Sequence, residues 1–207
     1  MTDLSLLVVV LDRSGSMTSI KNDMEEGLNG FLAAQKKEPG DCRLTFAQFD
    51  TEYEVLADYI DLKDAPYFTL TPRGSTALYD AIGQTLATVD EGLRKATPKP
   101  ENIIVCIVTD GQENASKEWT SEKVKELIES RPYNWKFTYL GANQTAILEA
   151  SRMGITAATS LTYTPTSAGI RASYGSLSTS VSHTRSTGAA YSFTTTDRTQ
   201  AMSRKKP

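Results

Sequence analysis

LLVVVLDRSGS, residues 6–16, is a run of six apolar residues that ends in an acid followed by two serines at alternating positions. The apolar part, Leu6–Leu11, has no polar alternation, which is typical of a strand buried on both faces of a parallel sheet. In open α/β sheets, ligands bind outside the carboxyl ends of the strands. We therefore expect Asp12, Ser14 and Ser16 to lie at a ligand site on the edge of such a sheet.

Two interpretations of Asp12, Ser14 and Ser16 are open. Short polar side chains commonly turn the chain and cap the next helix, and this structural role alone accounts for all three residues. Alternatively, oxygen side chains at i, i+2 and i+4 of a loop converge on one point. Aspartate with hydroxyls is a set of hard oxygen ligands that suits Mg²⁺, Mn²⁺ or Ca²⁺. Further ligands elsewhere in the chain would favour the metal site.

The composition is that of one globular α/β domain. The chain has 207 residues, of which 39% are hydrophobic and 23% charged, enough for one sizeable core. No apolar run approaches the roughly 20 residues that span a bilayer, and the first residues lack the basic segment of a signal peptide. We expect a soluble, cytoplasmic protein with no membrane partner. The net charge is −3. Residues 185–207 are basic, so the rest of the chain is more acidic than this total, and an acidic domain argues against nucleic-acid binding.

The two cysteines, Cys42 and Cys106, fall in predicted strands that flank the Leu6–Leu11 strand. Strands two positions apart are separated by roughly 9.5 Å, which is too far for a disulfide. We expect two buried free thiols, as is usual in a reducing compartment.

Strands and helices alternate along the chain. Further strands are predicted at Cys42–Phe49, Tyr53–Ile60, Ile103–Val108, Trp135–Leu140 and 157–163. Helices are predicted from Ser16 to Pro39, from Thr76 through Leu93, from Thr120 or Ser121 through Ile128, around Ile147 and Leu148, and from Thr164 as the N-cap through Val181. This alternation predicts an α/β fold, with a doubly wound (Rossmann-like), mostly parallel six-stranded sheet. The expected order is 3-2-1-4-5-6, with one antiparallel edge strand and helices on both faces.

The predicted domain covers residues 1–185. Residues 186–207 are rich in serine and threonine, show no apolar period and end in Arg204-Lys205-Lys206-Pro207. We expect these residues to form a flexible basic tail.

A second buried strand also ends in an acid. Thr109-Asp110-Gly111 follow Ile103–Val108, and strands 1 and 4 are neighbours in the expected order. Asp12 and Asp110 should therefore meet at one edge of the sheet. Their separation should be about one strand spacing, 5 Å, plus whatever the loops add. The loop before the second long helix brings Thr76 to that helix's N-terminus.

The chain resembles the von Willebrand factor type A domain in three motifs. These are D-R-S-G-S-M at 12–17, G-S-T at 74–76 and T-D-G at 109–111, in the family's order and structural contexts. The resemblance covers about residues 4–184. The family's metal-ion-dependent adhesion site (MIDAS) corresponds to Asp12, Ser14, Ser16, Thr76 and Asp110. The run G-A-N-Q at 141–144 is similar to small stand-alone bacterial and phage members.

The resemblance implies a bound Mg²⁺, or Mn²⁺ or Ca²⁺, held by the hydroxyls of Ser14, Ser16 and Thr76, with the two aspartates bonded directly or through water. Two aspartates balance the charge of the ion, and neutral hydroxyls leave one position attractive to an incoming carboxylate. The implied function is a non-enzymatic, divalent-metal-dependent protein-binding module. Its partner would be a protein that presents an exposed Asp or Glu.

Other polar residues are candidates for the surroundings of this site. Asp80 lies one turn after Thr76 and either orients a water molecule next to the metal or is a solvated helix residue. Seven more residues either form a rim that sets partner choice or are plain exposed loop residues: Arg13, Met17, Arg73, Gln112, Glu113, Asn114 and Asn143.

Two other functions stay open, a metal-dependent phosphoester hydrolase and a structural or assembly component with a secondary metal site. Doubly wound folds with an acid after strand 1 do transfer phosphoryl groups. This chain, however, has Ser14 in place of a second acid and lacks both the G-x-x-x-x-G-K-[ST] loop and the G-x-S-x-G motif. His183 is the only histidine available as a base, and D-R-S-G-S excludes the nicotinamide fingerprint. We therefore expect no enzymatic activity.

Overall fold

The computed structural model describes residues 4–142 and 145–203. Their six strands form one sheet in the order β3-β2-β1-β4-β5-β6. The strands are β1 (Leu4–Asp12), β2 (Asp41–Phe49), β3 (Tyr53–Asp61), β4 (Asn102–Thr109), β5 (Trp135–Gly141) and β6 (Ser160–Thr162). All neighbouring strands are parallel except β2 and β3, which pair antiparallel. The predicted sheet, its order and its antiparallel edge strand are confirmed.

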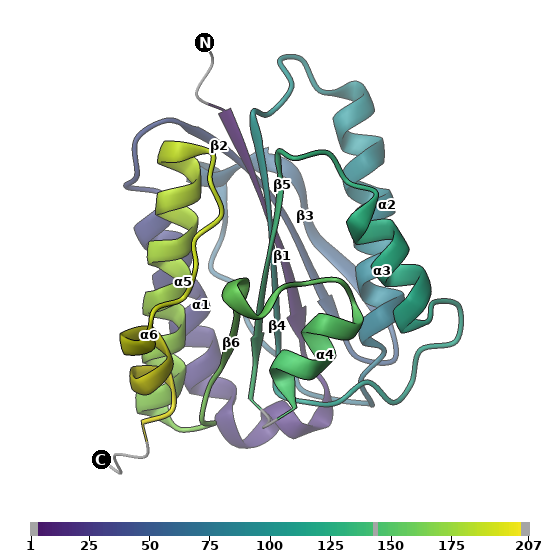
Figure 1. Ribbon diagram of the computed structural model, residues 1–207, viewed down its shortest axis with the longest axis vertical. Coiled ribbons are helices and arrows are strands. Elements are labelled where there is room, and N and C mark those ends of the chain that lie inside the picture. Colours follow the sequence, from purple (N-terminus) through teal and green to yellow (C-terminus); the bar gives the residue numbers. More distant parts are fainter. Residues whose placement is uncertain (1–3, 143–144, 204–207) are drawn as a thin grey trace.

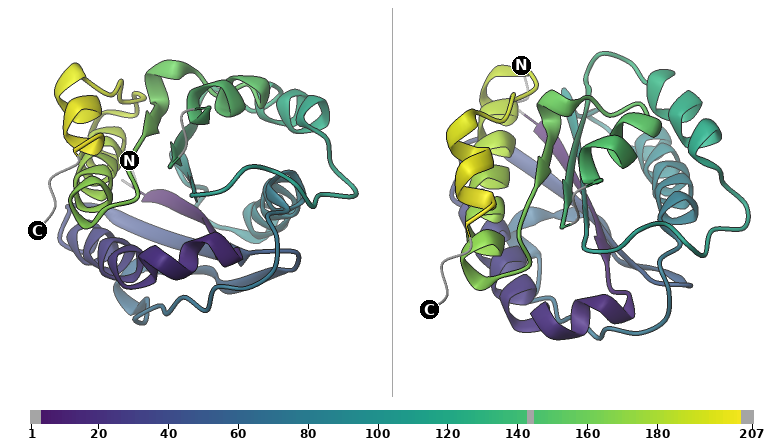
Figure 2. Two further views of the ribbon diagram at one scale, coloured as in Figure 1. Left: turned by 90° about the horizontal axis from the view of Figure 1, so that it is seen from below. Right: turned by 60° about the horizontal axis from the view of Figure 1, so that its bottom comes forward.

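Helices cover both faces of this sheet (Figure 1, Figure 2). One face carries α1 (Lys21–Gln35), α5 (Ser167–Thr187) and α6 (Thr195–Ala201), and the other carries α2 (Leu78–Lys95), α3 (Ser121–Glu129) and α4 (Ala146–Arg152). Short 3₁₀ helices are η1 (Gly15–Ile20), η2 (Leu62–Asp64) and η3 (Ala157–Thr159). Within the described ranges, none of the helices has the length and apolar character needed to cross a membrane.

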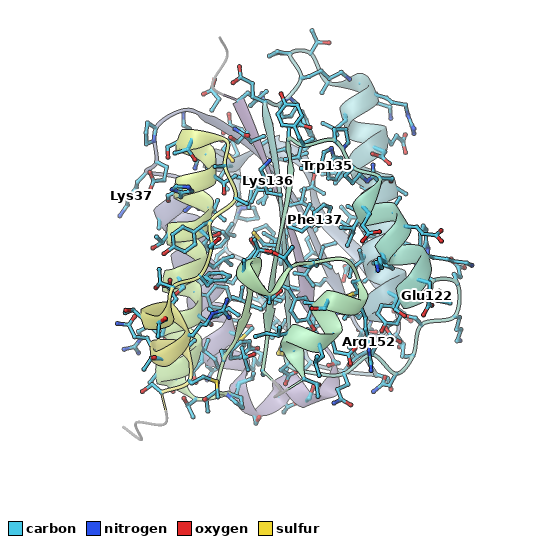
Figure 3. All side chains as sticks on the ribbon, in the orientation of Figure 1. Lys37, Glu122, Trp135, Lys136, Phe137 and Arg152 are labelled. Atoms are coloured by element: carbon cyan, nitrogen blue, oxygen red, sulfur yellow. The ribbon has the colours of Figure 1, made fainter. Side chains whose placement is uncertain are left out.

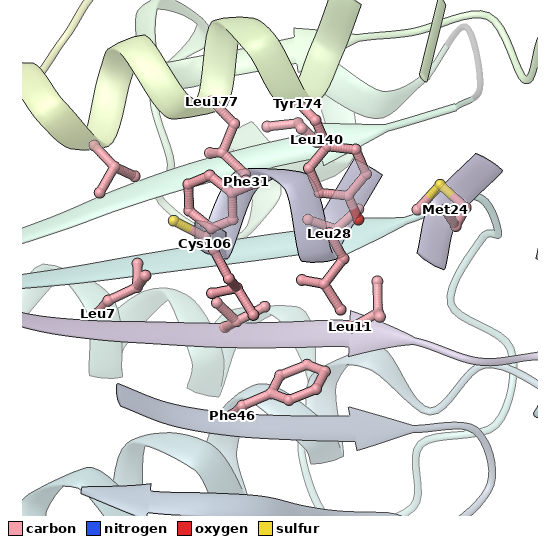
Figure 4. Packing of buried hydrophobic residues seen from close by; sticks show 14 of the residues in the cluster. Leu7, Leu11, Met24, Leu28, Phe31, Phe46, Cys106, Leu140, Tyr174 and Leu177 are labelled. Carbon is pink, nitrogen blue, oxygen red and sulfur yellow. The ribbon is translucent and has the colours of Figure 1, made fainter. Parts of the chain in front are cut away.

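Strand β1 lies between two hydrophobic cores and contributes side chains to both. Its side chains alternate between the core under α1 and α5 (Leu7, Val9 and Leu11) and the core under α2 and α3 (Leu6, Val8 and Val10). Figure 4 shows the first core, where Phe31 of α1 and Leu177 of α5 pack above β1. Because both faces are covered, residues 6–11 are at most 1% exposed, and this explains a run without polar alternation.

Strand β5 divides its side chains in the same way. The rings of Trp135 and Phe137 stack on the side of the second core with centroids 6.2 Å apart, whereas Lys136 lies on the opposite side of the strand (Figure 3). The Arg131 guanidinium lies 4.5 Å from the Trp135 ring centroid and pairs with Asp90 at 2.6 Å. This residue therefore links the end of α3 to α2.

The cysteines lie where the pattern predicts. Cys42 is on β2 and Cys106 on β4, with β1 between them, and both are buried free thiols. The predicted N-cap of α5 is wrong, because the cap is Thr166, whose hydroxyl accepts a hydrogen bond from the Gly169 N–H. Thr164 instead donates its N–H to the carbonyl of Ala201 in α6, a contact that helical spacing alone does not reveal.

The prediction of a flexible tail is wrong for residues 193–203. Helix α6 begins with a capping box in which Thr194 and Asp197 exchange side-chain and backbone hydrogen bonds. Phe193 is 6% exposed and Ala201 is fully buried, and both join the core under α5. Arg198 donates to the carbonyl of Ala157 in η3 and to that of Ser160 at the start of β6. The segment has too few apolar residues for a readable period, yet these few are enough to dock it onto the domain.

Candidate metal centre

Asp12 and Asp110 meet at the carboxyl edge of the sheet, as predicted. Asp12 is the last residue of β1, and Asp110 directly follows β4, its parallel neighbour. The register pairs Leu11 with Val108, so the two strands end together. The short helix η1 then carries the chain away from Asp12 with Ser14 as its N-cap.

The Asp12 carboxylate is buried and accepts two short hydrogen bonds. Its Oδ1 accepts from the Ser14 N–H at 2.6 Å, and its Oδ2 accepts from the Thr109 hydroxyl at 2.5 Å. Burial raises the pKa of Asp12 to about 6, although the hydrogen bonds from Thr109 and Ser14 work in the opposite direction. A nearby positive charge would favour the ionised carboxylate.

Ser14 and Ser16 connect Asp12 to Asp110 through hydrogen bonds. The hydroxyl oxygens of Ser14 and Ser16 lie 3.0 Å apart, and the Ser16 hydroxyl donates to Asp110 Oδ1 at 2.6 Å. Burial also raises the pKa of Asp110, against the effect of the Ser16 hydrogen bond. The Ser14 side chain makes no capping hydrogen bond to η1. The interpretation of these hydroxyls as helix caps is therefore wrong for Ser14.

Thr76 reaches the same place from a third loop. An ideal Cβ placed on Gly111 would lie 2.9 Å from Thr76 Oγ1 and 3.6 Å from both Asp12 Oδ2 and Ser16 Oγ. Three oxygens from two different loops thus surround one point that only glycine leaves open. Thr76 precedes Ala77, the N-cap of α2, and is 3% exposed.

Asp80 is bound to the loop that follows β4. Its carboxylate accepts backbone hydrogen bonds of 2.8, 3.0 and 2.8 Å from Lys117, Glu118 and Trp119. It therefore holds the loop after β4 against the first turn of α2, and it is not a solvated helix residue. Sequence spacing could not reveal this, because the partners lie 37 to 39 residues further along the chain.

Glu113 and Asn114 also join these two loops. Glu113 accepts a hydrogen bond of 3.0 Å from the Tyr79 N–H, and Asn114 Oδ1 accepts one of 2.9 Å from the Thr76 N–H. Gln112 is exposed and donates from its amide to the Thr145 hydroxyl at 3.3 Å. Met17 is fully buried in the core, so it does not form a rim. Asn143 lies outside the described residues.

Arg13 and Arg73 belong to an ionic cluster beside the site. Both donate from Nε to Asp50 Oδ2, at 2.8 and 2.9 Å, and their other nitrogens pair with Glu54 and Glu52 respectively. Arg13 is 6% exposed and Asp50 is 1% exposed. The cluster ties the Asp12 loop, the β2–β3 turn and the loop before Thr76 to one another. Arg13 is thus a buried structural residue, while half of the Arg73 side chain stays exposed.

Three residues around the site were missed by sequence reasoning. Thr109, inside the T-D-G motif, orients Asp12 through its hydroxyl. The Tyr163 hydroxyl donates a hydrogen bond to the Thr109 carbonyl at 3.2 Å. Asp50 directly follows Phe49 of β2, so it ends a buried strand as Asp12 and Asp110 do. This position in the sequence is the feature that could have identified Asp50.

The residues at this edge fit a hard divalent cation. Asp12 and Asp110 offer carboxylates, and Ser14, Ser16 and Thr76 offer neutral hydroxyls. In the described part of the chain there is no group of three or more His, Cys, Asp and Glu side chains that could hold a metal. Any site here depends on the hydroxyls, and an all-oxygen set suits Mg²⁺, Mn²⁺ or Ca²⁺ better than metals that prefer thiolate or imidazole.

No family model and no curated protein matches the sequence. Solved structures do match the fold. Proximal thread matrix protein 1 from the mussel byssus superposes with a TM-score of 0.62 and 16% identity, over 86% of this chain and 46% of that one. A von Willebrand factor type A protein from Catenulispora acidiphila gives 0.58 and 14%, over 85% and 42%. The manganese-loaded TRAP protein of Plasmodium vivax gives 0.55 and 21%, over 72% and 63%.

This chain therefore has the fold of a von Willebrand factor type A domain. It spans less than half the length of the mussel and Catenulispora chains. One structure of the mussel protein has a zinc-occupied MIDAS motif.

Proposed function

We propose that this chain is a non-enzymatic, divalent-metal-dependent protein-binding module, in which a bound Mg²⁺ or Mn²⁺ accepts an acidic side chain of a partner protein. The observation that carries the proposal is the convergence of Thr76, Asp12 and Ser16 oxygens around Gly111. The zinc-occupied motif of the mussel protein and the manganese-loaded Plasmodium protein support a divalent ion in this fold.

The five candidate ligands would contribute differently to binding an ion. The carboxylates of Asp12 and Asp110 would supply the negative charge, and the hydroxyls of Ser14, Ser16 and Thr76 would supply neutral oxygens. When bound, the cation supplies a positive charge with a coordination position open to a carboxylate.

Burial of the five residues also gives the site a direction. Asp12, Ser14 and Thr76 are at most 3% exposed and close the site from the protein side. Ser16 is exposed and Asp110 is partly exposed. An incoming acidic side chain would therefore approach along the side of Ser16 and Asp110.

Affinity capture with the immobilised chain tests this function. We expect a partner to be retained in Mg²⁺ and released by EDTA, and we expect Asp12→Ala to lose it in Mg²⁺. Substituting the contacting Glu or Asp of that partner by Ala should release it as well. A partner that stays bound in EDTA would contradict the proposal and favour a structural or assembly role with a secondary metal site.

A phosphatase assay separates the module from a hydrolase. The single histidine, His183, packs its ring against Tyr191 with centroids 5.7 Å apart, and neither residue contributes to the Asp12 and Asp110 cluster. We expect no turnover of p-nitrophenyl phosphate in Mg²⁺ above that of Asp12→Ala. Turnover that is lost in Asp12→Ala would establish the hydrolase instead.

A further inference from the structure

The start of α2 is capped by a distant segment of the chain. Ala77, the N-cap of α2, makes no side-chain capping hydrogen bond, so the first N–H groups need other partners. Glu113 accepts from the Tyr79 N–H, and the Ser116 hydroxyl accepts from the Asp80 N–H at 3.1 Å. Glu113 also accepts from the Ser116 hydroxyl at 2.7 Å, which orients both groups towards the helix.

Asn114 lies at the centre of this capping segment and holds Thr76 from both sides of its backbone. Its Oδ1 accepts from the Thr76 N–H at 2.9 Å. Its own N–H, together with that of Ala115, donates to the Thr76 carbonyl at 3.0 and 3.2 Å. The adjacent peptide is held separately, because the Ala77 N–H donates to the Asp50 carbonyl at 2.9 Å.

Thr76 is therefore tied to the loop that carries Asp110. The Thr76 hydroxyl lies against Gly111, and Asn114 holds the Thr76 backbone from three residues beyond that glycine. The Asp12–Ser16 turn is held by other bonds, none of which involves Asn114. Asp12 accepts from the Ser14 N–H within the turn, the Ser16 hydroxyl donates to Asp110, and the Gly15 N–H donates to the Gly74 carbonyl at 3.1 Å. The position of Thr76 relative to Asp110 thus depends on Asn114, whereas the positions of the two serines do not.

We propose that Asn114 is a positioning residue for the metal site, acting through the backbone of Thr76 to place the Thr76 hydroxyl among the ligands. This inference rests on the proposed function. Without the Oδ1 acceptor, the Thr76 N–H loses its partner, and a buried N–H without a partner favours a backbone shift that lets it reach water. A shift of this kind moves the hydroxyl away from Gly111 while the carboxylates stay in place.

The test uses the full chain with Mn²⁺ as the probe. Calorimetry gives the Mn²⁺ affinity, and water-proton relaxation gives the number of water molecules bound directly to Mn²⁺. The variants are Thr76→Ala, Asn114→Ala, the double variant and Asn114→Asp, which keeps the acceptor. Lys117→Ala is the matched control, because its side chain is exposed and its backbone bond to Asp80 remains. Thermal melts of the metal-free proteins report folding.

We expect Thr76→Ala and Asn114→Ala to lower the Mn²⁺ affinity by similar factors, roughly tenfold as for other residues that orient metal ligands. Each should add a water to Mn²⁺, and the double variant should lose no more than either single one. Asn114→Asp and Lys117→Ala should keep the wild-type water number.

Several results would overturn the positioning role. One is a lower melting temperature for Asn114→Ala with unchanged affinity and water number, which marks a purely structural residue. Others are additive losses in the double variant, or a Thr76→Ala protein that binds Mn²⁺ as wild type does. If the wild-type chain itself binds no Mn²⁺, the proposed metal site is wrong and the positioning role falls with it.

Discussion

The Thr109 hydroxyl donates a 2.5 Å hydrogen bond to Oδ2 of Asp12 and so joins the last residues of the neighbouring strands β4 and β1. The same hydroxyl accepts from the Gly111 N–H at 3.1 Å. One side chain therefore orients the buried acid of the first loop and shapes the T-D-G turn of the second. The two halves of the proposed metal site depend on this contact.

We predict that Thr109→Val weakens Mn²⁺ binding and lowers stability, whereas Thr109→Ser does neither. Valine keeps the shape but leaves a buried carboxylate oxygen of Asp12 without a donor, which costs about 1–3 kcal/mol. Mn²⁺ affinity should fall by roughly tenfold, as for other residues that orient metal ligands. Urea unfolding and calorimetric titration measure the two effects. Equal behaviour of the valine and serine variants would show that the hydrogen bond is unimportant.

Arg13 and Arg73 contact the same oxygen of Asp50 but should differ in their effect on stability. Arg13→Ala removes the buried cation from Asp50, which then keeps only the half-exposed Arg73 as a cationic partner. Losing a buried partner costs about 3 kcal/mol. Arg73 is 52% exposed in its side chain, so Arg73→Ala should cost at most about 1 kcal/mol. Urea unfolding of the two variants provides the comparison. Similar losses for both would contradict the burial argument.

The contribution of Asp50 to stability should disappear in acid. Burial alone would raise the pKa of Asp50, but hydrogen bonds from Arg73, the Glu52 N–H and Arg13 outweigh it and lower the pKa. A lowered pKa means that the stabilisation is present above the unfolded pKa of about 3.9 and is lost as the pH falls through the folded one. The difference in unfolding free energy between wild type and Asp50→Asn should therefore shrink from pH 7 to pH 3. A difference independent of pH would refute it.

The sheet could be predicted because its strands follow simple rules. Two stretches are continuous apolar runs, Leu6–Leu11 and Ile103–Val108. A strand needs apolar residues at every position when helices cover both of its faces. Right-handed crossovers then make the two strands neighbours. Because Asp12 and Asp110 each follow such a run, the sequence alone predicts that they meet at one edge of the sheet. Thr76 was found through the family's G-S-T motif at the start of a helix.

Contacts between distant loops could not be predicted in the same way. Helical spacing relates Asp80 only to Thr76, one turn away, but the partners of Asp80 are backbone N–H groups of residues 117–119, which no side-chain pattern marks. Helix α6 was missed for another reason. Thr194 and Asp197 have the spacing of a capping box, a readable signal, but the short helix lacks an apolar period that would have drawn attention to it.

The C-terminal segment should contribute measurably to stability. Phe193 is 6% exposed within the core under α5, so Phe193→Ala should cost about 3 kcal/mol and lower the melting temperature by roughly 6–12 °C. Met202→Ala, at a side chain 41% exposed, is the control in the same segment and should change little. If Phe193→Ala melts as wild type does, the segment is a flexible tail after all.

Calorimetric titration of Mn²⁺ into wild type and Asp12→Ala tests the central claim most directly. Asp12 lies at the end of β1 and contacts Thr109 and Ser14, so the variant should remain folded by circular dichroism, with some loss of stability. Asp12→Asn keeps the shape and removes the charge, with an amide donor in place of one acceptor oxygen. We predict one Mn²⁺ bound by the wild-type chain and no measurable binding by either folded variant. Undiminished affinity in folded Asp12→Ala and Asp12→Asn would show that the metal centre is not at this edge of the sheet.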